Sequence, residues 1–322
     1  MTFECLKSVS YPAPPDQPQT RLHTIDIWLP QQQAAFPLNE RVWIVFVHGG
    51  AWRNPFQSSE CFEPAMSQIK TMANDKDSFL GKVAGFAAPN YRLSPNLEAD
   101  APTTPDPAAS AKHPDHLQDV IYAIKHLYKQ YDISQSMGYI LVGPSCGATL
   151  AFQVATYSLN RHQSVIPSPL GVIGLNGVYD LAGWLRVASS SVYDDIVETA
   201  FGSDREIWEK ASPMHQVQSD WTVDHHTAKP ISLTFLAYSL EDTVVADSQT
   251  LEMLEKLKHW SQPHQATVNT GSILSPPSAP DEQQQRIVLS KVINGGHDEV
   301  WEKPEQMLAC IAEAVKKVCG MD

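Results

Sequence analysis

The sequence has little of what marks several common classes of protein. Its five cysteines are odd in number and scattered, without paired disulfide spacing or a C-x-x-C metal motif. Its acids and histidines form no H-E-x-x-H or similar cluster. No apolar run approaches the roughly 20 residues of a membrane span, and the start of the chain lacks a signal pattern. The sequence therefore predicts no metal site, no cofactor-binding motif, no disulfide framework and no membrane span.

Positive charge is also scarce. The chain has 23 lysine and arginine residues against 36 acidic residues, a formal net charge of −13. A nucleic-acid or anionic-membrane partner would need a basic patch, so we expect neither. Without a targeting signal at the C-terminus, the expected location is cytoplasmic, with reduced thiols. The sequence leaves a homodimer open.

Apolar strands and amphipathic helices alternate along the chain. At 322 residues and 43% apolar content it fits one domain, residues 1–322. Strands are predicted at 21–29, 42–47, 83–88, 139–142, 170–175, 231–238 and 286–293, and helices at 58–73, 115–131, 148–155 and 304–318. In the first strand, Ile25, Ile27 and Leu29 should share the buried face and Asp26 should lie on the other. This alternation predicts an α/β fold with a mostly parallel central sheet and helices on both faces.

Three segments interrupt the alternation. The proline-rich stretches 96–114 and 262–285 predict exposed, mobile insertions. Residues 180–228 hold short helical pieces and predict a small helical cap. Its aromatic residues could line a substrate pocket or form the cap's own core; they are Trp184, Tyr193, Phe201, Trp208 and Trp221.

The most informative motif is Gly-Pro-Ser-Cys-Gly at residues 143–147. A G-x-S-x-G between a buried strand and a helix is typical of a nucleophile elbow, in which a sharp turn raises the serine hydroxyl above the sheet edge. The glycines are needed because a side chain would crowd that turn. We therefore predict Ser145 as a catalytic nucleophile in an α/β-hydrolase fold.

A second motif, His48-Gly49-Gly50, directly follows the apolar strand at 42–47. In α/β-hydrolases a backbone N–H from this loop joins that of the residue after the nucleophile to form an oxyanion hole. We predict the N–H groups of Gly49, Gly50 and Cys146 as its donors, with His48 orienting the backbone. The alternative is a Gly-Gly turn that only ends a strand.

The acid and the base follow the last two predicted strands. Asp242 stands two residues before Val244, as in the acid loop of this fold, although the adjacent Glu241 is an alternative. His297 lies in a glycine-rich turn after the final strand, where the fold places its general base. The order Ser145, Asp242, His297 is that of α/β-hydrolases. The other histidines are predicted to be structural or on the surface, with His113 and His116 capping a helix or exposed.

Further residues carry family resemblances. The Tyr-Arg-Leu-Ser-Pro segment at 91–95 resembles hormone-sensitive-lipase-like and arylesterase-like hydrolases, where Arg92 would anchor loops beneath the site. The His-Gly-Gly-Ala-Trp segment at 48–52, followed by Arg-Asn-Pro, resembles the kynurenine formamidases, closest to their fungal form. The resemblance extends over roughly 20–318, except the two proline-rich insertions. Pro144 departs from it, since many relatives have a residue with an N–H there.

The resemblance implies a cofactor-independent serine hydrolase that converts N-formyl-L-kynurenine, a small-molecule substrate, to L-kynurenine and formate in tryptophan catabolism. The arylamine leaving group needs an aromatic wall, for which Trp52 and Tyr179 are candidates, and Arg53 and Arg186 are candidates for the substrate carboxylate. Two alternatives stay open. One is a general carboxylesterase or arylesterase with the same triad, and the other is a non-catalytic binding protein built on this fold.

Overall fold

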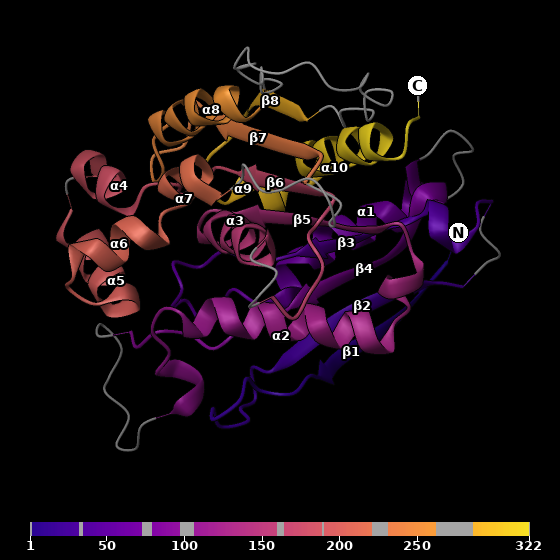
Figure 1. Ribbon diagram of the computed structural model, residues 1–322, viewed down its shortest axis with the longest axis horizontal. Helices are drawn as coiled ribbons and strands as arrows, with labels where there is room; N and C mark the ends of the chain where they lie inside the picture. The colour runs from indigo at the N-terminus through magenta and orange to yellow at the C-terminus, as the bar shows by residue number, and fades with distance from the viewer. Residues whose placement is uncertain are drawn as a thin grey trace, which may run out of the picture.

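The computed structural model describes residues 2–31, 35–72, 79–96, 106–159, 164–188, 190–220, 231–261 and 286–321. Eight strands of this part form one sheet in the order β1-β2-β4-β3-β5-β6-β7-β8 (Figure 1). They are β1 (Phe3–Ser10), β2 (Thr24–Pro30), β3 (Val42–Phe46), β4 (Val83–Pro89), β5 (Gly138–Pro144), β6 (Gly171–Leu175), β7 (Leu233–Ser239) and β8 (Ile287–Ile293). β2 pairs antiparallel with β1 and β4, and the pairings from β4 to β8 are parallel. The mostly parallel sheet is confirmed.

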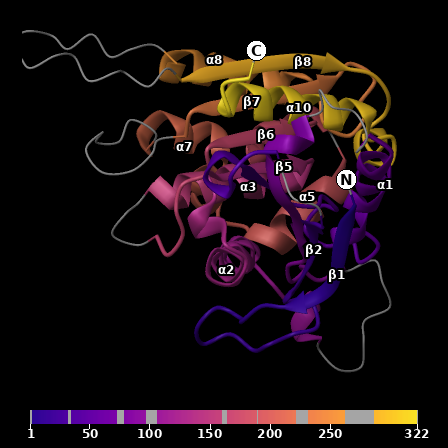
Figure 2. The ribbon, with the colours of Figure 1, turned by 90° about the vertical axis from the view of Figure 1, so that its right-hand side faces the viewer.

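Helices cover both faces of the sheet because its strands are apolar on both sides (Figures 1 and 2). One core cluster includes side chains of α2 (Asp115–Gln130), α3 (Cys146–Leu159) and α8 (Ser248–Ser261). The opposite cluster includes α1 (Glu63–Met72), α9 (Glu299–Glu302) and α10 (Glu305–Val318). None of the helices in the described ranges has the length and apolarity to cross a bilayer.

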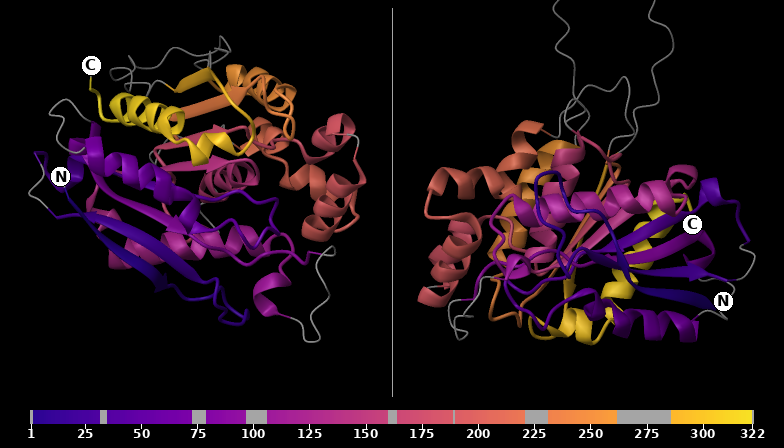
Figure 3. Two further views of the ribbon diagram at one scale, coloured as in Figure 1. Left: turned by 180° about the vertical axis from the view of Figure 1, so that it is seen from behind. Right: turned by 90° about the horizontal axis from the view of Figure 1, so that it is seen from below.

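The predicted cap is a group of short helices between β6 and β7, to one side of the sheet (Figure 3). It contains α4 (Leu181–Ala188), α5 (Ser191–Phe201), α6 (Arg205–Ala211) and α7 (Pro213–Asp220). Trp184, Phe201 and Trp208 are buried in the core cluster of α2 and α3. The indole N–H of Trp184 donates to the carbonyl of Val244 at 2.9 Å, so this aromatic ring ties the cap to the main domain. Trp221, the insertion 262–285 and residues 97–105 of the insertion 96–114 lie outside the described residues.

The amino-terminal part of the sheet differs from the prediction. β1 was not anticipated, because its residues form no apolar run, and in the structure each is half-buried or exposed. The pattern predicted one buried face for β2, but on the other face Asp26 is only 2% exposed and Trp28 is fully buried. The Asp26 carboxylate accepts hydrogen bonds from the side chains of Lys7 and Ser59, both at 2.9 Å. A side chain from the neighbouring strand β1 and one from the segment before α1 therefore bury the second face of β2 at Asp26.

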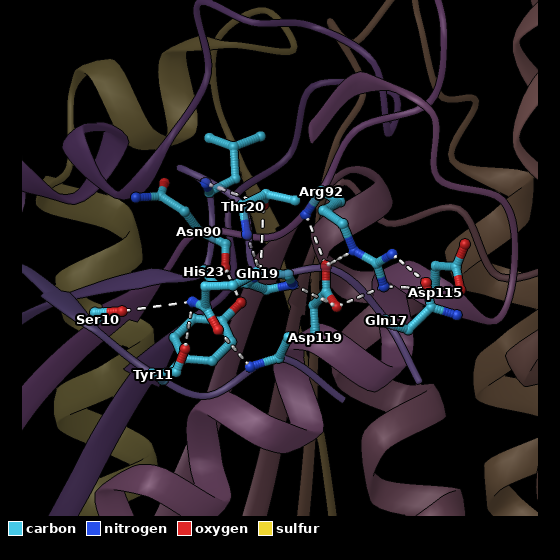
Figure 4. Close-up of polar contacts among 12 residues, drawn as sticks. Ser10, Tyr11, Gln17, Gln19, Thr20, His23, Asn90, Arg92, Asp115 and Asp119 are labelled. Atoms are coloured by element: carbon cyan, nitrogen blue, oxygen red, sulfur yellow. Dashed lines mark hydrogen bonds and ion pairs between the residues drawn. The ribbon is translucent and has the colours of Figure 1, made fainter. Parts of the chain in front are cut away.

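A buried polar network beneath the sheet edge joins the N-terminal segment, the loop after β4 and α2 (Figure 4). Arg92 donates from Nε and Nη2 to the two carboxylate oxygens of Asp119, both at 2.8 Å. The backbone N–H of Arg92 donates to the same carboxylate at 2.9 Å, and His23 Nε2 lies 3.2 Å from it. Arg92 Nη1 also donates to Gln17 at 2.9 Å. Arg92 therefore anchors loops, as predicted.

The prediction for His116 was wrong, because this side chain is buried and its Nε2 lies 2.9 Å from Ser94 Oγ. Burial lowers the pKa of His116 to about 3 and that of His48 to about 4. An unfolded histidine has a pKa of about 6.5. As the pH falls below that value, protons bind the unfolded chain before the folded one. The stability contributed by these neutral histidines is complete above about pH 6.5 and is lost progressively on acidification.

We therefore expect the free energy of unfolding to fall by about 1.4 kcal/mol per pH unit for each such histidine between about pH 6 and pH 4. Urea denaturation at several pH values measures the slope. His116→Gln, whose amide can still donate to Ser94, should reduce the slope by one histidine's share. An unchanged slope in this variant would show that His116 is not a source of the acid sensitivity.

Candidate active site

The Gly-Pro-Ser-Cys-Gly motif forms a tight turn between β5 and α3. Ser145 has φ of 53°, in the left-handed region that most side chains avoid. A Cβ on Gly143 would lie 2.3 Å from the carbonyl carbon of Gly147, and a Cβ on Gly147 would lie 2.2 Å from the carbonyl oxygen of Val47. Both positions therefore need glycine. The sterically enforced turn places Ser145 at the carboxyl end of a central strand.

The structure brings the three residues predicted as a triad into one hydrogen-bonded row. His297 Nε2 lies 2.9 Å from Ser145 Oγ, and His297 Nδ1 lies 2.7 Å from Asp242 Oδ2. The Asp242 side chain is fully buried, and its Oδ1 accepts the N–H groups of Val244 and Val245 at 2.8 and 2.9 Å. The valines after the aspartate thus fix the carboxylate, and their amides leave Oδ2 directed at the imidazole.

Glu241, the alternative acid, makes a different contact. Its Oε1 accepts the N–H of Gly295 at 3.1 Å, and Ser239 Oγ donates to the carbonyl of Gly295 at 2.6 Å. These bonds tie the loop after β7 to the loop that carries His297. The roles of Ser239 and Glu241 were not predicted, since a contact with a distant main chain leaves no signal in a sequence.

The loop after β3 lies against Ser145. A Cβ on Gly49 would lie 3.3 Å from Ser145 Cβ. Gly50, Ala51 and Trp52 have φ of 97°, 50° and 57°, so three successive left-handed residues curve the chain. Cys146 is the first residue of α3, where an N–H has no intrahelical partner. Gly49, Gly50 and Cys146 are therefore on the two segments that border the serine, and their role as oxyanion donors remains a prediction.

The Cys146 thiol is not poised for chemistry. The residue is 1% exposed, and burial raises the pKa of the thiol to about 11. Its sulfur accepts the N–H of Trp52 at 3.4 Å. The side chain therefore packs as a neutral group between the elbow and the loop after β3. Among the residues that the structure describes, no three histidine, cysteine, aspartate or glutamate side chains are grouped as metal ligands.

The two aromatic candidates for substrate binding are buried in the core. Trp52 is fully buried, with its ring edge-on to Phe201 of α5 at 5.0 Å. Tyr179 is also fully buried and packs edge-on against Phe152 of α3 at 5.4 Å. Their contact with a substrate remains a prediction.

The two candidate arginines differ in their surroundings. Arg53 is 7% exposed and forms an ion pair with Asp195 of α5. The Arg186 side chain is 69% exposed and lies 3.5 Å from Asp180. Arg53 therefore already has a carboxylate partner within the chain, which links the loop after β3 to the cap. Neither arginine is assigned to a substrate by these contacts.

The protein has the fold of an α/β-hydrolase. Three features define it: the sheet order, the elbow after β5, and the aspartate and histidine on the loops after β7 and β8. Solved structures agree on the fold. Esterase B from Lactobacillus rhamnosis has a TM-score of 0.63 at 13% identity, covering 99% of this chain and 87% of that one. The hyperthermophilic esterase from Pyrobaculum calidifontis has a TM-score of 0.59 at 14% identity, covering 100% and 87%.

Sequence comparison gives the family. The kynurenine formamidase-like hydrolase fscH of Fusarium equiseti is 31% identical over 306 residues, 92% of this chain and 90% of that protein. The kynurenine formamidase of Meyerozyma guilliermondii is 30% identical over 228 residues, 68% of this chain and 73% of that protein. No protein-family model matches the sequence. The chain belongs to the kynurenine formamidase family, and the resemblance predicted from its motifs is confirmed.

Proposed function

We propose that this protein is a serine hydrolase that cleaves the formamide bond of N-formyl-L-kynurenine to give L-kynurenine and formate. The observation that carries the proposal is the hydrogen-bonded row of Ser145, His297 and Asp242 in a chain of this family. Each side chain is held in place by its own loop, which is the preorganisation that nucleophilic catalysis requires.

In the acylation step, His297 Nε2 takes the Ser145 proton while Oγ forms a bond to the formyl carbon. The carbonyl oxygen gains the negative charge, and the N–H groups of Gly49, Gly50 and Cys146 stabilise it. Asp242 holds His297 with Nδ1 protonated and stabilises the imidazolium without taking its proton. His297 then donates its proton to the amine nitrogen as the C–N bond breaks, which releases L-kynurenine and leaves a formyl ester on Ser145.

The second step reverses these roles. His297 takes a proton from a water molecule, whose oxygen attacks the formyl ester carbon. The tetrahedral intermediate collapses, the Ser145 oxygen regains a proton from His297, and formic acid leaves and loses its remaining proton to solvent as formate. The proton transfers to and from Ser145, the leaving amine and the attacking water all pass through His297, and the proposed steps use no metal or cofactor.

The competing proposal, a general carboxylesterase, has the same triad and fold. Parallel measurement of kcat/KM for N-formyl-L-kynurenine and for 4-nitrophenyl acetate and butyrate separates the two. We expect the formamide to be preferred by about 10-fold or more, because family membership predicts a site shaped for its leaving group. A larger kcat/KM for the butyrate ester would instead assign the protein as an esterase.

A further inference from the structure

The segment after β4 runs along the loop after β3 and is bonded to its backbone. Ser94 N–H donates to the carbonyl of Trp52 at 2.8 Å. Tyr91 is fully buried, and its hydroxyl lies 2.9 Å from the carbonyl oxygen of His48 and 3.0 Å from that of Gly49. One hydroxyl therefore faces two successive carbonyls. They belong to the residues that immediately precede Gly49 and Gly50, in the loop that borders Ser145.

These two carbonyls belong to the peptide groups that carry the predicted oxyanion donors. The carbonyl of His48 shares a peptide plane with the N–H of Gly49, and the carbonyl of Gly49 shares one with the N–H of Gly50. In a trans peptide the C=O and N–H point in opposite directions. With both carbonyls facing Tyr91, both N–H groups point away from it, and two successive N–H groups on one side of the chain are an arrangement that binds anions.

The side chain of His48 adds a second donor to the same group. Its Nδ1 lies 2.9 Å from the carbonyl oxygen of Gly49, and its ring stacks on Tyr91 with centroids 4.2 Å apart and planes 9° apart. Burial keeps the imidazole neutral by lowering its pKa to about 4, and burial also raises the pKa of the Tyr91 hydroxyl well above its ordinary value. Both groups are therefore neutral donors at physiological pH, and donation to a carbonyl also polarises the N–H of the same peptide.

We propose that Tyr91, together with His48, is a positioning residue that orients the peptide groups of Gly49 and Gly50 toward the oxyanion. Tyr91 touches no reacting atom and acts through the backbone of the loop after β3. The inference rests on the proposed acyl-transfer chemistry at Ser145, but not on which acyl compound is the substrate. It gives the tyrosine of the Tyr-Arg-Leu-Ser-Pro segment a role separate from that of Arg92, whose side chain binds Asp119 and Gln17.

Tyr91→Phe removes the hydroxyl and keeps the ring, and Tyr139→Phe is its matched control. Tyr139 is also fully buried, and its hydroxyl donates to the carbonyl of Pro167 at 2.7 Å. It lies six residues before Ser145 on β5, about 20 Å away along an extended strand. Each substitution therefore removes the hydroxyl of a fully buried tyrosine that donates to the main chain, but only Tyr91→Phe affects the loop after β3.

We expect Tyr91→Phe to lower kcat about 10- to 100-fold with KM nearly unchanged, somewhat less than the loss of a whole oxyanion donor. The affinity for a trifluoromethyl ketone, which forms a charged tetrahedral adduct with the serine, should fall by a similar factor. Tyr139→Phe should leave both values close to wild type. Equal kcat values for the two variants, or a Tyr91→Phe effect confined to KM, would overturn the proposal.

The rate of Ser145 labelling by a fluorophosphonate separates this proposal from the choice of substrate. If wild-type protein hydrolyses no formylkynurenine, the proposed function fails, but slower labelling of Tyr91→Phe than of Tyr139→Phe would still support the positioning role. If Tyr91→Phe does not fold, His48→Asn and His48→Leu replace it. The asparagine amide can donate to the Gly49 carbonyl, and the leucine side chain cannot. Faster labelling of His48→Asn than of His48→Leu supports the proposal, and equal labelling rates for the two variants contradict it.

Discussion

Replacing Ser145 by alanine is expected to lower kcat for N-formyl-L-kynurenine by about 10⁴-fold or more, with KM and stability almost unchanged. The residue is only 8% exposed, and the φ of 53° is imposed by the elbow rather than by the side chain. Removing Oγ leaves His297 and Asp242 paired, so the rest of the site stays assembled. The predicted oxyanion donors would still bind the substrate carbonyl, and the remaining rate would reflect a water molecule as nucleophile.

Single-turnover kinetics of wild type, Ser145→Ala, His297→Ala and the double variant measure this effect. Because Ser145 and His297 act as one unit, the double variant should be little slower than either single variant. His215→Ala, which removes a histidine whose side chain is 41% exposed, should have wild-type activity. Substantial turnover by Ser145→Ala would place the nucleophile elsewhere and contradict the mechanism.

Asp119→Ala is expected to destabilise the fold by about 3–5 kcal/mol, the usual cost of leaving a buried charge without its partner. The Asp119 side chain is fully buried, and that of Arg92 is 3% exposed (Figure 4). Burial alone would raise the pKa of Asp119, but hydrogen bonds from His23 and Arg92 outweigh burial and lower it. The aspartate is therefore a carboxylate, and its removal leaves the guanidinium uncompensated.

Urea denaturation at pH 7 measures the loss, with Arg21→Ala as the control. Arg21 pairs with Asp106 at 2.9 Å, but the two side chains are 64% and 40% exposed, so this ion pair is worth about 0–1 kcal/mol. If Asp119→Ala cost no more than Arg21→Ala, the buried network would not be the anchor of the N-terminal segment. Activity per folded molecule should change little, because no member of the network contacts Ser145 or His297.

The sequence by itself determined the strands of the sheet from β2 to β8, the helices α2, α3 and α10, and the predicted triad positions. Apolar runs and 3.6-residue periodicity are local properties that can be found in a single sequence. A strand followed by G-x-S-x-G predicts one local structure, the sharp strand-to-helix turn of a nucleophile elbow. The elbow is a case in point, because Gly143 and Gly147 are required by contacts within a few residues and with the adjacent strand. The chain order of Ser145, Asp242 and His297 then follows from the order of the strands.

The sequence favoured Asp242 over Glu241 as the acid, but only the tertiary structure shows which of the two meets His297. Asp242 does, while Glu241 is bonded to Gly295. It also decided that Asp26 and His116 are buried, and that Tyr91 holds the backbone of the loop after β3. Each of these contacts joins side chains to segments far away in the chain, often to a main-chain atom that any residue would supply. A single sequence carries no periodic or local signal for such a contact, because only the packing of β-strands and loops brings the partners together.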